Sequence, residues 1–405
     1  MSITLASFPG PTVRTISLID GGFSWKQRLQ EAWEYPLSTI PSRESAIYKR
    51  NTTSIVGMVS LSLRMPHVTA FPKALGTGIV ISTPQPVHED LRTRMSALLE
   101  TYEQMLSRFR DDSLVAEIGR AKHGGNFDFP DWTEPLFGLY DALFAATSSA
   151  IDPCIGEDLI RFGYDASLSF TVKPGSAKHL GALRGRPTWG DDVERRGTTL
   201  ITRRPVDLDF GACGKGYLVD LLGAFLAPAS AEFVIDAGGD LLIHSAEPIA
   251  IALEDPDDST RAIGVAHIID GALCASAPSR RHWEVAVNER TQLSIHHLLN
   301  AIDGLPVQQT EATWVYMPGS APDPSARVRE PEARAIHGAP RASDSSPQDA
   351  IGPFAAHPSA LADGLATALF TTSPEELRRA FSFACVTLNA GRHAAVSSDF
   401  PGRLF

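Results

Sequence analysis

Apolar residues recur at intervals of three and four between Glu89 and Phe109, a spacing that predicts an amphipathic helix with one buried face. Two further helices are predicted over 136–150 and 359–371. A short helix is expected after Ser373, because this capping serine is followed by a proline at the first helical position and a glutamate at the third. Helical segments are therefore expected in both halves of the chain.

Alternating β-forming residues predict strands over 56–65 and 78–83, and several strands follow one another between 231 and 269. The segment 206–209 alternates apolar and acidic residues and is also expected to be a strand, with its charges on one side. A glycine-rich turn follows it, and then an apolar run over 217–226 that predicts a helix. Strands and helices are thus mixed along the chain.

The segment Pro318–Pro358 differs in composition from its surroundings. It holds 8 of the 29 prolines and almost no large apolar side chains. Such a segment cannot bury enough apolar surface to offset the entropy lost on ordering, so we expect a disordered surface insertion within one domain. That domain is expected to span 56–405, and the mixed polarity of 1–55 indicates an extension without an assignable role.

Composition excludes several classes of protein. Of the 405 residues, 43% are hydrophobic and 20% charged, as in ordinary globular proteins. The net charge of −11 argues against nucleic acid and anionic membranes as partners. We see no apolar run long enough for a membrane span, no signal-like N-terminus and no paired cysteine spacing, so a cytoplasmic protein is expected.

The glycine-rich turn contains Gly211, Gly214 and Gly216, with Lys215 between the last two. Backbone without side chains can approach a phosphate closely, and the following helix directs its N–H groups and the positive end of its dipole toward an anion. Lys215 adds a point charge. The turn therefore indicates an anion site, although a tight connection between a strand and a helix would have the same composition.

Asp363 and Thr367 stand four residues apart in a predicted helix and so share one face. A carboxylate and a hydroxyl are hard oxygen ligands suited to Mg²⁺. Alternatively, Asp363 favours the helix N-terminus and Thr367 bonds back to its own helix. Gly364 between them is a poor helix residue, which indicates either a close approach by another segment or a kink.

Two of these motifs together resemble the FAD:protein FMN transferases, the ApbE-like flavin transferases. They are Asp209-Phe210-Gly211-Ala212-Cys213-Gly214-Lys215-Gly216-Tyr217, with Asp220 beyond it, and Asp236-Ala237-Gly238-Gly239-Asp240. The family patterns are D-L-G-G-I-A-K-G-Y-x-x-D and N-A-G-G-D. Other similar segments are Leu75-Gly76-Thr77, Leu106-Ser107-Arg108-Phe109, Ile151-Asp152-Pro153-Cys154-Ile155-Gly156, Leu273-Cys274-Ala275-Ser276-Ala277 with Arg281, and Ala362-Asp363-Gly364-Leu365-Ala366-Thr367-Ala368-Leu369.

The resemblance, from about Leu75 to Phe370, implies an α+β fold with a T-fold-like core of two lobes and FAD held between them. It implies that Mg²⁺ is held by Asp363, Thr367 and the carbonyl of Ala212. It also implies flavin-nucleotide contacts at Leu75, Phe109, Ile151, Asp152, Asp209, Lys215, Gly238, Gly239 and Asp240. For Phe109, helical spacing alone would instead favour an ordinary core aromatic.

The implied reaction transfers FMN from FAD to a threonine or serine of an acceptor flavoprotein and releases AMP. FAD hydrolysis to FMN and AMP in the same site is one alternative. A flavin-binding protein without catalysis is another.

The family pattern H-[IV]-[IL]-D-P-x-T-G-x-P implies a histidine that takes part in the chemistry, and two positions compete for it. His267 has matching neighbours but comes too early in the chain, whereas His297 keeps the order and the spacing to Gly304. We therefore assign the catalytic role to His297. Asn300 stands where the family has aspartate, and this loss of an acid puts catalysis in question. Other departures lie at Gly119, Cys154 and Ala277, so a divergent member is expected.

Overall fold

The computed structural model describes residues 64–288, 291–319 and 354–405, which all belong to one compact unit, Ser42–Phe405. The predicted N-terminal extension (1–55) and most of the predicted strand over 56–65 lie outside the described residues, as does most of the predicted insertion. The two ends of that insertion do not match the prediction. Pro318 is the last residue of a strand, Phe354 is buried in the core, and Pro358 begins a helix.

The described residues form the following elements. The α-helices are α4 (Glu89–Leu106), α5 (Leu114–Arg120), α6 (Glu134–Ala146), α7 (Gly156–Arg161), α8 (Trp189–Asp192), α9 (Gly214–Leu226), α10 (Pro358–Ala368) and α11 (Pro374–Leu377). The strands are β1 (His67–Phe71), β2 (Ile79–Thr83), β3 (Gly125–Asp128), β4 (Val193–Arg196), β5 (Thr199–Thr202), β6 (Phe233–Asp236), β7 (Asp240–Asp255), β8 (Asp258–Ser276), β9 (His282–Asn288), β10 (Thr291–His296), β11 (Leu299–Asn300), β12 (Leu305–Pro306), β13 (Thr310–Pro318), β14 (Ala384–Asn389), β15 (Ala394–Val396) and β16 (Gly402–Leu404).

A large antiparallel sheet carries the fold. Its strands lie in the order β1-β2-β6-β7-β8-β13-β14-β15, and β16 pairs with β8. Alternate residues of one strand enter different apolar clusters: in β6, Phe233 and Ile235 join one cluster and Val234 joins the other. This part of the sheet is therefore buried on both faces, as expected for strands with apolar residues at successive positions.

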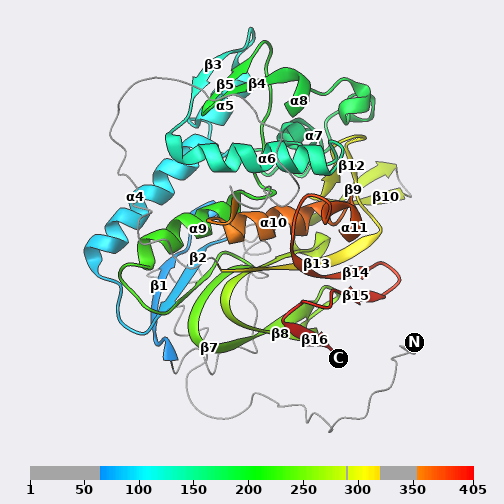
Figure 1. The fold of residues 1–405 in the computed structure, drawn as a ribbon. Coiled ribbons are helices and arrows are strands. Elements are labelled where there is room, and N and C mark those ends of the chain that lie inside the picture. Colours follow the sequence, from blue (N-terminus) through cyan, green and yellow to red (C-terminus); the bar gives the residue numbers. More distant parts are fainter. Residues whose placement is uncertain (1–63, 289–290, 320–353) are drawn as a thin grey trace, which may run out of the picture. The chain divides into compact units, whose positions relative to one another are not determined.

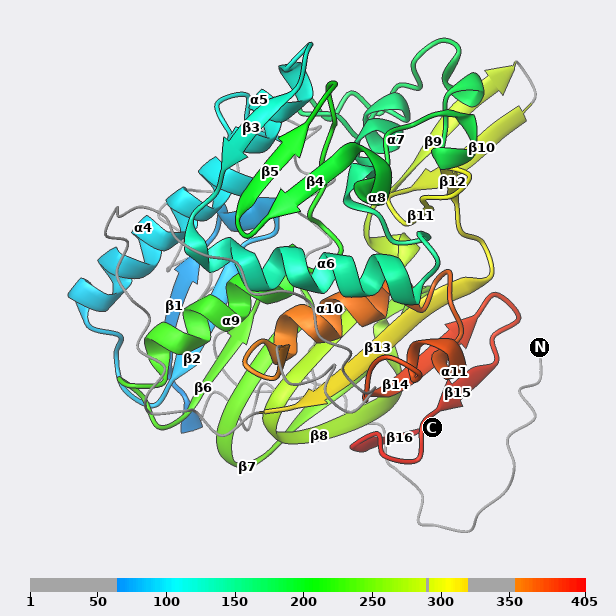
Figure 2. The same cartoon turned by 45° about the horizontal axis from the view of Figure 1, so that its top comes forward.

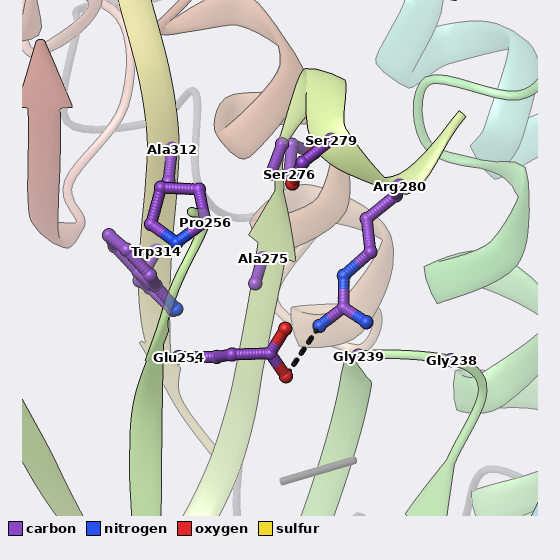
Figure 3. Close-up of a pocket in the computed structure, with 11 residues that line it drawn as sticks. Gly238, Gly239, Glu254, Pro256, Ala275, Ser276, Ser279, Arg280, Ala312 and Trp314 are labelled. Carbon is purple, nitrogen blue, oxygen red and sulfur yellow. Dashed lines mark hydrogen bonds and ion pairs between the residues drawn. The ribbon is translucent and has the colours of Figure 1, made fainter. Parts of the chain in front are cut away.

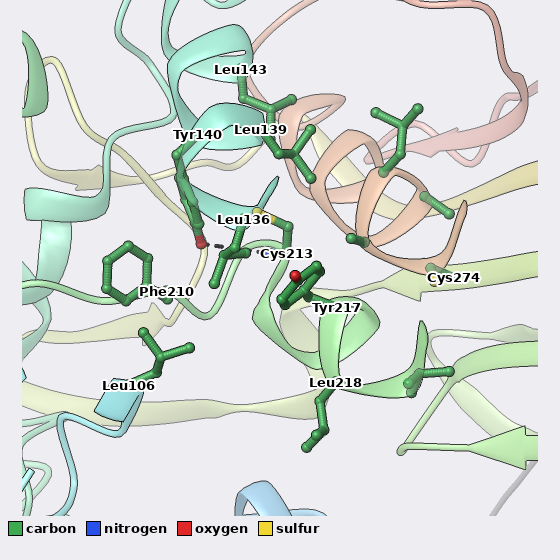
Figure 4. Close-up of a cluster of buried hydrophobic side chains, with 14 of the residues drawn as sticks. Leu106, Leu136, Leu139, Tyr140, Leu143, Phe210, Cys213, Tyr217, Leu218 and Cys274 are labelled. Atoms are coloured by element: carbon green, nitrogen blue, oxygen red, sulfur yellow. Dashed lines mark hydrogen bonds between the residues drawn. The ribbon is translucent and has the colours of Figure 1, made fainter. Parts of the chain in front are cut away.

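Helices α9 and α10 lie on one face of this sheet, and α6 lies beyond them (Figures 1 and 2). The apolar cluster that joins these layers includes Tyr140 of α6 and Tyr217 and Leu218 of α9 (Figure 4). Smaller sheets, β3-β5-β4, β9-β10 and β11-β12, lie on the far side of α6 from the large sheet (Figure 2). The layered arrangement places the start of α9 and the middle of α10 inside the molecule.

The helix predictions are confirmed at five places: α4, α6, α9 and α10 overlap the predicted segments, and Ser373 and Glu376 form the predicted capping box of α11. One strand prediction was wrong. The segment 206–209 keeps its alternation of buried and partly exposed residues, but it pairs with no strand in the described residues. Alternating apolar and polar residues show that one side of a segment is buried. Such a segment need not be a strand in a sheet.

Helices α9 and α10 pack so closely that their backbones touch. A Cβ atom added at Gly216 would lie 2.1 Å from the carbonyl oxygen of Ser359, and one added at Gly364 would lie 2.7 Å from Leu143 and 3.3 Å from Cys213. These distances are far below van der Waals contact. The poor helix former at Gly364 is therefore explained by the close approach of other segments.

We predict that Gly216→Ala lowers the free energy of unfolding by at least the ~1–3 kcal/mol typical of overpacking, because backbone atoms of Ser359 cannot move aside. Gly223→Ala in the same helix is the matched control. Its added Cβ would meet only the end of the Leu242 side chain, at 2.5 Å, and alanine improves helix propensity. Urea unfolding of both variants measures the difference, and equal losses would contradict close backbone packing as the cause.

Candidate functional site

Lys215, in the first turn of α9, lies between two buried carboxylates. Its Nζ atom is 2.9 Å from Oδ1 of Asp363 and 3.1 Å from Oδ2 of Asp240. The backbone N–H of Gly216 donates to Oδ2 of Asp363 at 3.0 Å. Asp240 comes from the start of β7 and Asp363 from α10, so three elements meet here. With both carboxylates ionised, this group carries one more negative than positive charge.

The electrostatics of this group favour an additional cation. Burial, together with the nearby charge of Asp240, raises the pKa of Asp363 well above its ordinary value. Burial alone would lower the pKa of Lys215, but Asp240 and Asp363 outweigh that effect and raise it, so the lysine stays charged. Neither oxygen of Asp240 accepts a hydrogen bond of good geometry, although Oδ2 is within ion-pair distance of Lys215. The buried excess of negative charge is thus only partly compensated.

The three oxygens that the sequence assigns to a metal lie close to this group. The hydroxyl of Thr367 is 3.4 Å from the carbonyl oxygen of Ala212, and Asp363 lies one turn earlier on α10. In the part of the chain that the structure describes, no group of three or more His, Cys, Asp or Glu residues is placed to hold a metal ion. A cation here would rely on one carboxylate, a hydroxyl and a carbonyl, a set of hard donors that Mg²⁺ accepts. These residues therefore fit a magnesium ion.

Asp220 holds the start of α10 against α9. Its Oδ1 accepts the backbone N–H of Ser359 at 2.9 Å, and its Oδ2 accepts that of Ala360 at 2.8 Å. These N–H groups belong to the first turn of α10, so no carbonyl oxygen of the same helix can accept them. Asp220 thus caps α10 from another helix and sets where Asp363 and Thr367 lie. Sequence reasoning included Asp220 in a motif but gave it no role.

A second charged pair lies beside the glycine-rich turn. Arg108, just beyond the end of α4, forms an ion pair with Asp209, whose Oδ1 also accepts the backbone N–H of Gly211. Burial would raise the pKa of Asp209, but Arg108 outweighs burial and holds it below its usual range. Phe109 is 39% exposed, so it is no ordinary core aromatic, and its ring meets Tyr164 edge-on.

His297 interacts electrostatically with both charged groups: it helps to lower the pKa of Asp209, and Lys215 helps to lower the pKa of His297. Burial, and then the charge of Arg281, lowers the pKa of His297 to about 3, so the ring is neutral at physiological pH. Its Nδ1 lies 3.3 Å from the carbonyl oxygen of Arg281. A carbonyl only accepts, so Nδ1 carries the proton and Nε2 keeps a lone pair that can take up another.

The competing histidine and Asn300 have simpler explanations. His267 is exposed in β8, where it pairs with Ala250 of β7. The side-chain oxygen of Asn300 accepts the backbone N–H of Ile302 at 2.9 Å, a bond that an aspartate would also make. The difference from the family pattern at Asn300 therefore removes a charge and keeps the turn.

Comparison with known proteins decides the family. Residues 75–323, more than half of the chain, match the family model described as "ApbE family". The chain belongs to the ApbE family. The matched residues end before α10, so the family model does not cover Asp363 and Thr367.

Two curated relatives and two crystal structures are similar to this ApbE-family chain. The FAD:protein FMN transferase of Klebsiella pneumoniae (strain 342) is 21% identical over 56% of this chain and 66% of its own length. That of Rhodobacter capsulatus is 26% identical over 49% of this chain and 40% of its own. The matches thus span less than two thirds of either relative.

The ApbE protein of Thermotoga maritima superposes with a TM-score of 0.61 at 17% identity, over 82% of this chain and 97% of that one. The flavinyl transferase ApbE of Pseudomonas stutzeri, in its apo form, gives 0.59 at 20% identity, over 82% and 95%. The predicted family and α+β fold are confirmed.

The remaining residues that the ApbE resemblance implied are placed as follows. Leu75 has a left-handed backbone (φ 53°), and its N–H donates to Glu103 at 2.7 Å. Ile151 is buried, and the Asp152 carboxylate accepts the N–H groups of Cys154 at 2.8 Å and Trp189 at 3.2 Å. The Asp152 carboxylate is thus already hydrogen-bonded within the protein. Contacts of Leu75, Ile151 and Asp152 with flavin stay predictions.

Gly238 and Gly239 form the turn between β6 and β7 and border a pocket. The pocket is also lined by Glu254 and Arg280, whose side chains form an ion pair at 3.1 Å (Figure 3). Asp240 follows Gly239 directly, so the pocket adjoins the Lys215 group. Sequence reasoning assigned the two glycines and Asp240 but did not single out Glu254.

We predict that Asp220→Asn reduces the pH dependence of stability. Burial raises the pKa of Asp220 to about 7, against its ordinary value near 4. Between those pH values the folded chain holds a proton that the unfolded chain has lost, so the free energy of unfolding falls as pH rises. One such group contributes a slope of at most about 1.4 kcal/mol per pH unit.

Urea unfolding of wild type and Asp220→Asn at several pH values tests this. The variant is expected to be less stable overall, because the amide cannot accept both N–H groups of α10. Its stability should nevertheless decline less steeply from about pH 4 to about pH 7. Identical slopes in the two proteins would contradict the proposed protonation of Asp220.

Proposed function

We propose that this chain is a magnesium-dependent FAD:protein FMN transferase, which moves FMN from FAD to a threonine or serine of an acceptor flavoprotein and releases AMP. The observation that carries the proposal is the convergence of the Ala212 carbonyl, Thr367 and Asp363 beside Lys215. Membership of the ApbE family and relatives named FAD:protein FMN transferases support it. The acceptor protein is inferred from the reaction named for those relatives.

The residues of the site have distinct tasks in this reaction. Mg²⁺ held by Asp363, Thr367 and the Ala212 carbonyl would neutralise charge on the diphosphate of FAD. Lys215 stays charged and, through its ion pairs, holds Asp363 and Asp240 in place. Phosphoryl transfer needs mainly positioning and charge neutralisation, which these fixed groups supply.

His297 is proposed as the base. The acceptor hydroxyl oxygen would bond to the phosphorus of the FMN moiety, and the bond between that phosphorus and the bridging oxygen would break. AMP leaves with the bridging oxygen, and the hydroxyl proton passes to Nε2 of His297. A neutral, partly buried imidazole with Nδ1 bound to a carbonyl has the tautomer that this step needs.

The test is incubation of the purified chain with FAD and Mg²⁺, with and without an acceptor flavoprotein, followed by separation of FAD, FMN and AMP. Transfer predicts AMP release with flavin bound covalently to the acceptor and little free FMN. Free FMN and AMP without acceptor would indicate hydrolysis instead. FAD that binds and stays intact under all conditions would overturn the proposal.

We predict that Asp363→Ala abolishes AMP release while the chain stays folded, because the only carboxylate in the proposed metal set is lost. Thr367→Val should cause a smaller loss, since a neutral hydroxyl holds the ion less strongly. Thr371→Val, just beyond the same helix, removes a hydroxyl that bonds only within its own turn and should leave turnover unchanged. EDTA should mimic Asp363→Ala in wild type, and wild-type turnover in that variant at saturating Mg²⁺ would rule out the metal assignment.

A further inference from the structure

Arg108 has a buried nitrogen without a hydrogen-bond partner in the part of the chain that the structure describes. Its Nε contacts Asp209 and its Nη1 donates to the carbonyl oxygen of Tyr164 at 2.6 Å, whereas its Nη2 makes no hydrogen bond. The side chain is only 6% exposed. A buried cationic side chain usually has all its N–H groups hydrogen-bonded. A free N–H at this place therefore indicates that it donates to a bound ligand.

The guanidinium of Arg108 contacts two aromatic rings, which also contact each other. Its carbon lies 4.2 Å from the ring centre of Phe109 and 4.8 Å from that of Tyr164. Arg281, from a distant part of the chain, contacts the hydroxyl of Tyr164, and its guanidinium lies 5.8 Å from the same ring. Two arginines thus share one tyrosine. Phe109, which is partly exposed, connects the cluster to solvent.

We propose that Arg108 binds a phosphate group of the flavin nucleotide through Nη2, and this proposal rests on the proposed function. Among the described residues, Asp209 is the carboxylate in ion-pair contact with these two guanidinium groups, so their direct contacts leave an excess of positive charge that suits an oxyanion, with Asp207 acting on Arg108 from farther away. The position is also suitable: Asp209, the partner of Arg108, lies three residues before Ala212 in the glycine-rich turn. Arginine presents a planar fork of donors that matches phosphate oxygens.

A neutral contact is the main alternative. Nη2 could donate to a carbonyl of the flavin ring, or Arg108 could serve only to hold Asp209. These possibilities differ in what they predict for flavins with and without a phosphate. Riboflavin carries the same ring as FMN and lacks the phosphate, so the ratio of the two affinities isolates the phosphate contact.

The experiment measures FMN and riboflavin binding to the full chain by flavin fluorescence, with EDTA present to remove any metal contribution. Arg108→Gln should weaken FMN binding by about tenfold or more and riboflavin binding by about twofold or less, because only FMN loses a charged contact. Arg108→Lys should recover part of the preference for FMN over riboflavin, since lysine keeps the positive charge but lacks the paired N–H donors of a guanidinium. Arg110→Gln is the matched control, because Arg110 pairs with Asp112 and Glu100 at the surface.

The variant Arg108→Gln leaves Asp209 unpaired, so it is also made together with Asp209→Asn, and the ratio of affinities within each folded protein is compared. Equal weakening of FMN and riboflavin in both forms would overturn the role of Arg108. Failure of the proposed function looks different: wild type would then bind FAD no better than riboflavin, or would bind FAD without releasing AMP.

Discussion

The candidate site depends on the contact between the backbones of α9 and α10. Only where Gly216 lies against Ser359 can the N–H of Gly216 reach the carboxylate of Asp363, with Lys215 beside it. Gly216 permits this approach at the expense of helix propensity. In return, a lysine, two buried carboxylates, a carbonyl and a hydroxyl are brought together where charges interact more strongly than in water.

Charge is distributed unequally around the glycine-rich turn. Toward α10 and β7, the carboxylates of Asp363 and Asp240 outnumber the single lysine. Toward Tyr164, Arg108 and Arg281 outnumber Asp209. One turn of backbone therefore separates a region suited to a cation from a region suited to an oxyanion. A metal complex of a nucleotide diphosphate presents both kinds of charge, and this matches the proposed substrate.

Local patterns in the sequence predicted the helices and singled out Lys215, Asp363 and Thr367, because helical spacing and turn composition act over a few neighbouring positions. Asp240 and the carbonyl of Ala212 were assigned only through the resemblance to the family. The pairing of Arg108 with Asp209 and the capping of α10 by Asp220 could not be predicted, since each joins segments more than a hundred residues apart. The segment 206–209 shows another limit: its alternation comes from burial of one side of an irregular segment, which pairs with no strand among the described residues.

Because Asp220 caps the first turn of α10, the positions of the site residues on this helix do not depend on the length of the chain that precedes it. Pro318 ends β13 and Pro358 begins α10, so the connection between these two elements spans about forty residues, yet the position of α10 is determined in its own first turn. A change in the length of that connection that keeps the core residue Phe354 should therefore leave Asp363 and Thr367 in place. The same independence makes the connection a convenient place for laboratory insertions such as affinity tags or fluorescent reporters.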